Sequence, residues 1–161
     1  CPCGYYNHPE KDCVCAPGVV QNYLNKISGP LLDRIDIHIE VTPVKFDELS
    51  DKRPAEPSEH VRDRVMKARL LQEARFEKNK GIYCNAQMTK QMINQHCEID
   101  QAGQALLKRA MERLGLSARA YDRILKVSRT IADLAESEAI LPEHLAEAIQ
   151  YRSLDRDSWA R

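Results

Sequence analysis

Apolar positions recur every three or four residues through the second half of the chain, a pattern typical of helices that bury one face. Thr89, Asp100 and Ser117 each precede such a stretch, and side chains of these types cap helix N-termini. Gly115 is placed to end the second of these helices and Pro142 to open the last. We therefore predict four packed helices in this half of the chain, enough to bury a core of their own.

The first half of the chain has a different pattern. Residues 17–27 predict a short helix, and residues 35–42 alternate between apolar and polar side chains, as a β-strand does. Prolines among charged residues at 43–57 indicate a linker. Ser58 is placed to cap a long helix that reaches about residue 79. The predicted apolar side of that helix consists of Val61, Val65, Ala68, Leu71 and Phe76.

The charge balance removes the simplest argument for a nucleic-acid-binding protein. Lysine plus arginine number 24 and aspartate plus glutamate number 24, so the formal net charge at pH 7 is zero. A neutral total is still compatible with a local basic patch. No apolar run approaches the roughly 20 residues that a membrane-spanning helix needs. We therefore expect a helix-rich cytoplasmic protein without a membrane partner.

Four of the six cysteines form two Cys-x-Cys pairs, Cys1–Cys3 and Cys13–Cys15. Two such pairs so close in sequence can present four thiolates to one tetrahedral ion, and thiolate is a favoured zinc ligand. His8 lies between the pairs and is a substitute ligand for Cys1. A structural zinc ion is therefore the favoured interpretation. The alternatives are disulfides, which a reducing cytosol disfavours, and unligated thiols.

The long helix predicted from residue 58 carries the most basic stretch of the chain. Its polar side holds Arg62, Arg64, Lys67, Arg69, Arg75, Lys78 and Lys80. Acidic residues interspersed among them favour a solvated face as the simpler interpretation. The functional alternative is contact with a DNA backbone or with another subunit, and Arg62, Lys67 and Arg69 are the candidate DNA contacts.

Arg34 stands at a corner of the chain. Residues 28–41 read SGPLLDRIDIHIEV, in which a Gly-Pro start opens a short helical turn, the Asp33–Arg34 pair ends it, and the alternating segment follows. A guanidinium at such a corner can reach out of its subunit and bind phosphate oxygens bidentately. The alternative is a local ion pair between Asp33 and Arg34.

This segment resembles the arginine-finger segment of the magnesium-chelatase-like branch of AAA+ ATPases, in its ComM/YifB type. The resemblance covers nearly the whole chain. It begins with CPCGY at residues 1–5 and resumes with NAQMT at 85–89. It is strongest in LGLSARAYDRIL at 114–125 and in HLAEAIQYRSLDR at 144–156.

The resemblance implies a mainly α fold. The chain would be the C-terminal helical lid bundle of an AAA+ ATPase, preceded by a Cys-rich knuckle, one strand of a truncated ATPase core and a long linker helix. The implied division is a remnant of the ATPase core at 1–45, the linker and long helix at 46–84, the lid at 85–152 and a polar tail at 153–161.

The resemblance also implies roles for three arginines. Arg34 corresponds to the arginine finger, which contacts the γ-phosphate of ATP held by a neighbouring subunit. Arg119, on the first helical turn after Ser117, corresponds to sensor 2, which contacts the nucleotide's phosphates where a helix N-terminus already favours anions. Arg123, one turn further, is the alternate nucleotide-binding residue. The alternative for Arg119 is a surface ion pair with Asp122.

For the intact protein the resemblance implies a homo-oligomeric ring, expected to be a hexamer, that hydrolyses ATP with Mg²⁺ and remodels DNA as a helicase-like branch-migration motor. The chain has no Gly-x-x-x-x-Gly-Lys-Ser/Thr loop to cradle phosphates, so by itself it is expected to be inactive as an ATPase. Two alternatives remain: the ATPase subunit of a magnesium chelatase, and a non-catalytic module for oligomerisation or DNA interaction.

Overall fold

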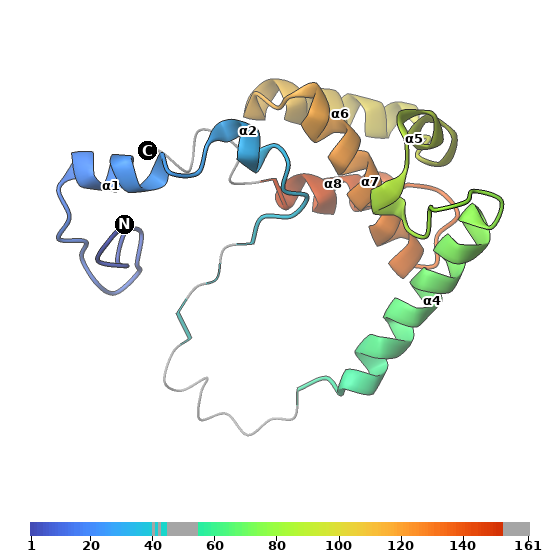
Figure 1. Cartoon of the computed structure of the whole chain (residues 1–161), viewed down its shortest axis with the longest axis horizontal. Helices are drawn as coiled ribbons and strands as arrows, with labels where there is room; N and C mark the ends of the chain where they lie inside the picture. Colours follow the sequence, from blue (N-terminus) through green and yellow to red (C-terminus); the bar gives the residue numbers. More distant parts are fainter. Residues whose placement is uncertain (40, 42, 45–54, 153–161) are drawn as a thin grey trace.

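The chain folds mainly into helices, as predicted. The computed structural model describes residues 1–39, 41, 43–44 and 55–152. Its helices are α1 (Pro17–Leu24), α2 (Gly29–Leu32), α4 (Ser58–Phe76), the 3₁₀ turn η1 (Asn85–Gln87), α5 (Lys90–His96), α6 (Gln101–Leu114), α7 (Ala118–Leu134) and α8 (Pro142–Gln150). Figure 1 shows α5 to α8 gathered in one bundle, α4 leading out of it, and α1 with the N-terminal loop set apart from it.

The bundle is built around α7, which packs against α4, α5, η1 and α8. Ile124 and Ala132 of α7 are fully buried, and they share one apolar cluster with Phe76 of α4 and Leu145 of α8. A fully buried Ile, Leu or Phe side chain stabilises the fold by about 1.5–3 kcal/mol relative to an exposed one. The predicted lid core is therefore present, and it also takes in the end of α4.

The predicted helix ends in this half of the chain are confirmed. The side-chain oxygens of Thr89, Asp100 and Ser117 each accept a hydrogen bond from the backbone N–H three residues later, at 3.4, 2.7 and 3.3 Å. Gly115 ends α6 with φ +59°, a left-handed conformation that glycine adopts without steric cost. Pro142 opens α8. These local signals fix where α5, α6, α7 and α8 begin.

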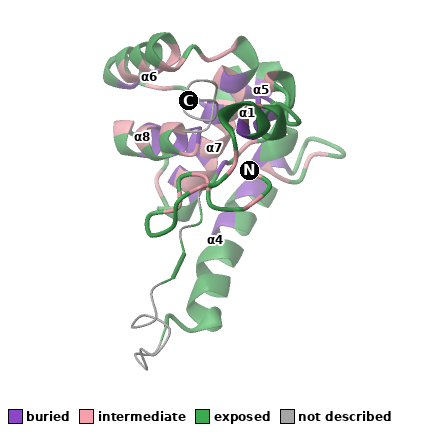
Figure 2. Ribbon diagram, turned by 90° about the vertical axis from the view of Figure 1, so that its left-hand side faces the viewer, coloured by how far each residue is buried: buried purple, intermediate pink, exposed green. Residues whose placement is uncertain are grey.

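The predicted apolar side of α4 is wrong at three of its five residues. Val61, Val65 and Leu71 are exposed, and the buried residues are Ala68, Gln72 and Phe76. Only the C-terminal half of α4 lies against the bundle, whereas its N-terminal half projects away from it (Figures 1 and 2). The first turn also lacks its predicted cap: Ser58 is the first helical residue, and no side-chain bond caps the helix.

The strand predicted for residues 35–42 is not formed by the described part of this segment. Ile35, Ile37 and Ile39 are exposed, and His38 from the polar side of the alternation is buried. The His38 N–H donates to the Tyr151 carbonyl at 2.8 Å rather than to a neighbouring strand. A strand requires a paired neighbour to satisfy its backbone groups, and the described residues supply none. Residues 40 and 42 lie outside the described residues.

α1 ends at Leu24, before the predicted end at residue 27. The predicted polar tail at 153–161 and most of the linker at 43–57 lie outside the described residues. Within the described ranges, no helix is both long enough and apolar enough to cross a membrane.

Candidate metal centre and arginine sites

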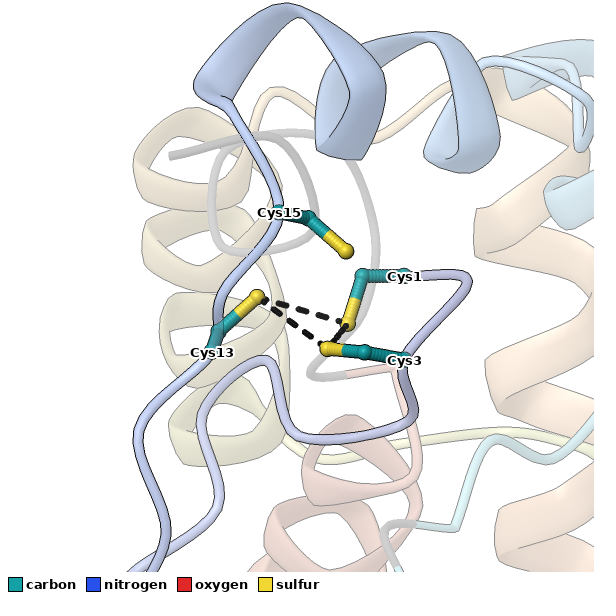
Figure 3. Close-up of side chains that lie close together, drawn as sticks. All are labelled: Cys1, Cys3, Cys13 and Cys15. Atoms are coloured by element: carbon teal, nitrogen blue, oxygen red, sulfur yellow. Dashed lines mark hydrogen bonds between the residues drawn. The ribbon is translucent and has the colours of Figure 1, made fainter.

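The two Cys-x-Cys pairs meet at one point. Figure 3 shows Cys1, Cys3, Cys13 and Cys15 turned toward one another, and their four Sγ atoms all lie within 4.8 Å of each other. The Sγ atom of Cys3 lies 3.3 Å from that of Cys1 and 3.5 Å from that of Cys13, while the Cys13–Cys1 separation is 3.6 Å. We call these four residues the cysteine cluster.

Backbone turns bring the pairs together. Gly4 and Asn7 have φ of +82° and +61°, values that glycine and asparagine tolerate best. The Gly4 N–H donates to the Cys1 carbonyl at 3.0 Å, and the Tyr6 N–H donates to the Cys1 Sγ at 3.1 Å. Sulfur atoms that accept backbone N–H bonds are held in place before any ligand arrives.

The geometry of the cysteine cluster fits a tetrahedral metal ion. Four sulfurs at about 2.3 Å from one zinc ion would lie about 3.8 Å apart, close to the separations found here. All six cysteines are free, and separations of 3.3 Å and more exceed the roughly 2.05 Å of a disulfide bond. The disulfide alternative is therefore not what the structure adopts. Zinc held by these four thiolates would cross-link two turns that have little apolar core.

The electrostatics of the cluster favour a thiolate at Cys3. A hydrogen bond from the Tyr5 backbone, opposed by burial and aided by the thiols of Cys15 and Cys13, lowers the pKa of Cys3 to about 7. A thiol with such a pKa is partly ionised at neutral pH, and the thiolate is the form that binds metal. Against a hydrogen bond from the Cys15 backbone, burial and the neighbouring thiols of Cys3 and Cys15 raise the pKa of Cys13. His8 is not a member of the cluster, because its Nδ1 accepts the Glu10 N–H at 3.0 Å.

Arg34 is exposed at the corner that follows α2. Its Nη1 donates to the Pro30 carbonyl at 2.8 Å, one turn back in the chain. The neighbouring Asp33 is buried, so the local Asp33–Arg34 ion pair is not how Arg34 is held. The guanidinium is tethered at one nitrogen and otherwise turned to solvent, where a phosphate oxygen can approach it.

Arg119 is exposed on the first turn of α7. Arg119 does not form the alternative ion pair with Asp122. The Asp122 Oδ1 pairs instead with Lys90 of α5. Arg123 lies one turn further, and its Nη1 binds Asp36 Oδ1, two residues after Arg34. The Arg34 corner and the start of α7 are therefore joined, although 87 positions separate Asp36 from Arg123 in sequence.

The basic residues of α4 have separate environments. Arg62 and Arg69 are exposed. Lys67 donates to Glu136 at 2.8 Å, and this hydrogen bond raises the pKa of Lys67. Arg75 is withdrawn from the basic face and bonded inside the fold. Of the three candidate DNA contacts, Arg62 and Arg69 are thus more available to a phosphate than Lys67.

Sequence reasoning missed an ion-pair cluster formed by Arg75, Asn85, Arg129 and Asp133. Asp133, with a fully buried side chain, accepts from Arg75 Nη2 at 2.5 Å, Arg129 Nε at 3.0 Å and Asn85 Nδ2 at 2.8 Å. Burial alone would raise the pKa of Asp133, but these hydrogen bonds and the two arginine charges hold it below its ordinary value. The i, i+4 spacing of Arg129 and Asp133 was the one signal available in the sequence.

The comparisons with known proteins cover both halves of the chain. A family model described as magnesium chelatase, subunit ChlI C-terminal, matches residues 55–152, and one described as magnesium chelatase, subunit ChlI, matches residues 1–49. The chain is 40% identical over 156 residues to the competence protein ComM of Haemophilus influenzae, and 39% identical over 159 residues to the uncharacterized protein YifB of Escherichia coli.

Each of these alignments covers 96% of this chain but 29% of the relative, so the chain spans under a third of the length of the curated relatives it matches. The matched segments include the cysteine cluster, the Arg34 corner and the whole helical bundle. The chain therefore belongs to the magnesium-chelatase-like family of AAA+ proteins, in its ComM and YifB type.

Proposed function

We propose that this chain supplies the arginine finger, the phosphate sensor and the lid of a ring-forming AAA+ ATPase that acts on DNA. The observation that carries the proposal is the placement of two exposed arginines on one folded unit. Arg34 follows α2, Arg119 opens α7, and the Arg123–Asp36 ion pair joins the two elements. Both guanidiniums can bind phosphate oxygens, and among the described residues no carboxylate forms a salt bridge with either.

In the proposed mechanism the two arginines act on different nucleotides. Arg34 contacts the γ-phosphate of ATP held by the neighbouring subunit and stabilises the negative charge that develops during phosphoryl transfer. Arg119 contacts the phosphates of the ATP held by its own subunit, where the N-terminus of α7 adds a favourable dipole. ATP and Mg²⁺ are bound by the part of the protein that carries the phosphate loop, since this sequence has none.

The proposal of DNA as the partner rests on two observations. The relative at 40% identity is named a competence protein. Helix α4 carries the exposed Arg62 and Arg69, whose charges can neutralise phosphates of a DNA backbone. In this view the ring is a helicase-like motor that moves branched or single-stranded DNA.

The test is ATP turnover of a full-length protein that contains this chain, with and without forked or single-stranded DNA. Arg34→Ala is expected to lower kcat by about 10³-fold or more with little change in the affinity for ATP. Arg109→Ala is the matched control, because Arg109 is also an exposed arginine bonded to a carbonyl four residues back, at 3.3 Å. Arg109→Ala should turn over ATP like the wild type.

The outcomes separate the candidate functions. Turnover that DNA stimulates, and that Arg34→Ala abolishes, supports the motor. ATP turnover that DNA does not change would favour the alternative function, the ATPase subunit of a magnesium chelatase. Unchanged turnover in Arg34→Ala would remove the finger assignment.

We also propose that the cysteine cluster holds one structural zinc ion through Cys1, Cys3, Cys13 and Cys15. The support is the convergence of four sulfurs at separations close to those of a tetrahedral site. The ion would fix the fold of residues 1–15 and take no part in ATP hydrolysis.

A further inference from the structure

The Arg34 corner is held on the lid by contacts from two helices. We define this corner as residues 32–38. At its far end the His38 N–H donates to the carbonyl of Tyr151, the residue that follows α8. Leu32 and His38, at the two ends of the corner, are buried although the three isoleucines around them are exposed. The corner therefore packs against the lid at defined points.

Arg152 makes the deepest of these contacts. Its side chain is 1% exposed, and its guanidinium donates from Nη1 to the Ile35 carbonyl and from Nη2 to the Leu32 carbonyl, at 3.5 Å for the latter. Leu32 is the last residue of α2, and its carbonyl also accepts a hydrogen bond from the Ile35 N–H at 3.0 Å. Burying an arginine is costly unless its donors are satisfied, and two of the hydrogen bonds of Arg152 go to the backbone on either side of Arg34.

Arg123 makes the second contact, from α7. Its ion pair with Asp36 is partly exposed, and it lies one helical turn from Arg119. Arg152 and Arg123 thus contact the corner on either side of Arg34. Arg152 lies just after α8, and Arg123 lies near the start of α7.

We propose that Arg152 and the Arg123–Asp36 pair, which together we call the clasp, are positioning residues that fix Arg34 to the lid. This inference rests on the proposed role of Arg34 as a finger. Its consequence is that the element which senses phosphates in one ATP site is rigidly joined to the finger that serves the next site. A rotation of the lid would then move the Arg34 of the same subunit.

The first experiment measures ATP turnover in the full-length protein for Asp36→Asn and Arg152→Lys. Each should lower kcat by about 10- to 100-fold, as expected for a small misplacement of a catalytic group, and leave the KM for ATP within about twofold. Arg152→Lys keeps the charge, but its single ammonium is not the planar fork that reaches both carbonyls. Glu136→Gln, which breaks the exposed Lys67–Glu136 pair at the other end of α7, is the matched control.

The second experiment shows whether the loss arises in the finger or from damaged folding. Asp36→Asn subunits keep their own ATP site, and Arg119→Ala subunits keep an intact corner. If the clasp acts through Arg34, rings mixed from the two variants regain turnover above that of either alone, because an intact finger then meets an intact site. A misfolded Asp36→Asn subunit would not be rescued in this way.

The results distinguish the two proposals. If Arg34→Ala lowers kcat but Asp36→Asn and Arg152→Lys match the wild type, the clasp is overturned and the finger stands. The clasp is also overturned if the mixed rings show no recovery. If Arg34→Ala leaves kcat unchanged, the proposed finger fails and the positioning role fails with it. Asp36→Asn decides the matter even if Arg152→Lys does not fold, since Asp36 lies at the surface.

Discussion

Arg75 of α4 and Asp133 of α7 form a salt bridge, Nη2 to Oδ1 at 2.5 Å, in which the aspartate side chain is completely buried. The second Asp133 oxygen accepts from Arg75 Nη1 and from Asn85 Nδ2, both at 2.8 Å. The side chains of α4, the η1 turn and α7 thus meet at one carboxylate. Because each of these groups is buried or nearly so, the arrangement is stable only while every partner is present.

Asp133→Asn tests this dependence. The substitution leaves Arg75 and Arg129 without their negative partner in a buried site, and we expect the free energy of unfolding to fall by about 3–5 kcal/mol. Urea denaturation followed by circular dichroism measures the change. The exposed pair provides the control, since Glu136→Gln should leave the midpoint almost unmoved. Equal effects of the two substitutions would contradict the role of the ion-pair cluster.

Acid should weaken the fold through the same residue. Against the effect of burial, the arginines in the folded chain hold the pKa of Asp133 below its ordinary value of 3.8. The unfolded chain therefore binds the proton more readily. The stability that this carboxylate contributes is fully present above pH 4 or so and is lost as the pH falls through the folded pKa. The difference in unfolding free energy between wild type and Asp133→Asn should therefore shrink below about pH 4. A difference that is constant or grows in acid would count against the ionised cluster.

Metal content tests the cysteine cluster. Native mass spectrometry of the purified chain should find one zinc ion, and a chelator should remove it with loss of protection from proteolysis in residues 1–15. Cys13→Ser should abolish the metal, because it removes one of four converging sulfurs. Cys84→Ser, at a half-buried thiol in the turn before η1, is the control and should retain it. Zinc lost equally from both variants, or absent from the wild type, would refute the site.

Gly115 tests the end of α6. Its φ of +59° is left-handed, and an alanine there should cost about 1–2 kcal/mol because its Cβ meets the following carbonyl oxygen. Crowding by the rest of the fold is not the cause, since a Cβ at this position would meet no atom within 4 Å outside residue 115 and its two chain neighbours. Gly115→Asn should cost less, because asparagine tolerates this conformation. Thermal unfolding of the two variants makes the comparison, and an equal loss of stability in both would argue against a backbone effect.

The lid was predictable from the sequence because its signals are local. Thr89, Asp100 and Ser117 bond to backbone groups three residues away, so spacing alone places the helix starts. Arg152 and Asp36 could not be assigned in this way. Their partners lie more than 80 positions distant, and no periodicity reports such a pairing.

The predictions of a strand at residues 35–42 and of the apolar side of α4 were wrong for a related reason. Alternation at residues 35–42 describes a segment suited to a sheet, but whether a sheet forms depends on a neighbouring strand. Val61 and Val65 have helical spacing, but burial depends on what lies opposite. The cysteine pairs were predictable in part. Their spacing indicated a common site, and the turn at Gly4 brings them together in the structure.

Helix α4 is held to the bundle only along its C-terminal half, so its N-terminal half extends as an unsupported rod. Nineteen residues at about 1.5 Å each give a rod of about 28 Å, held only from Lys67 onward. The unsupported part, from Ser58 to Met66, is about 14 Å long, so a tilt of about 12° at its base would displace its tip by about 3 Å. That distance is about the length of a hydrogen bond. A rearrangement too slight to break the Arg75–Asp133 contact would thus be enough to make or lose one at Arg62.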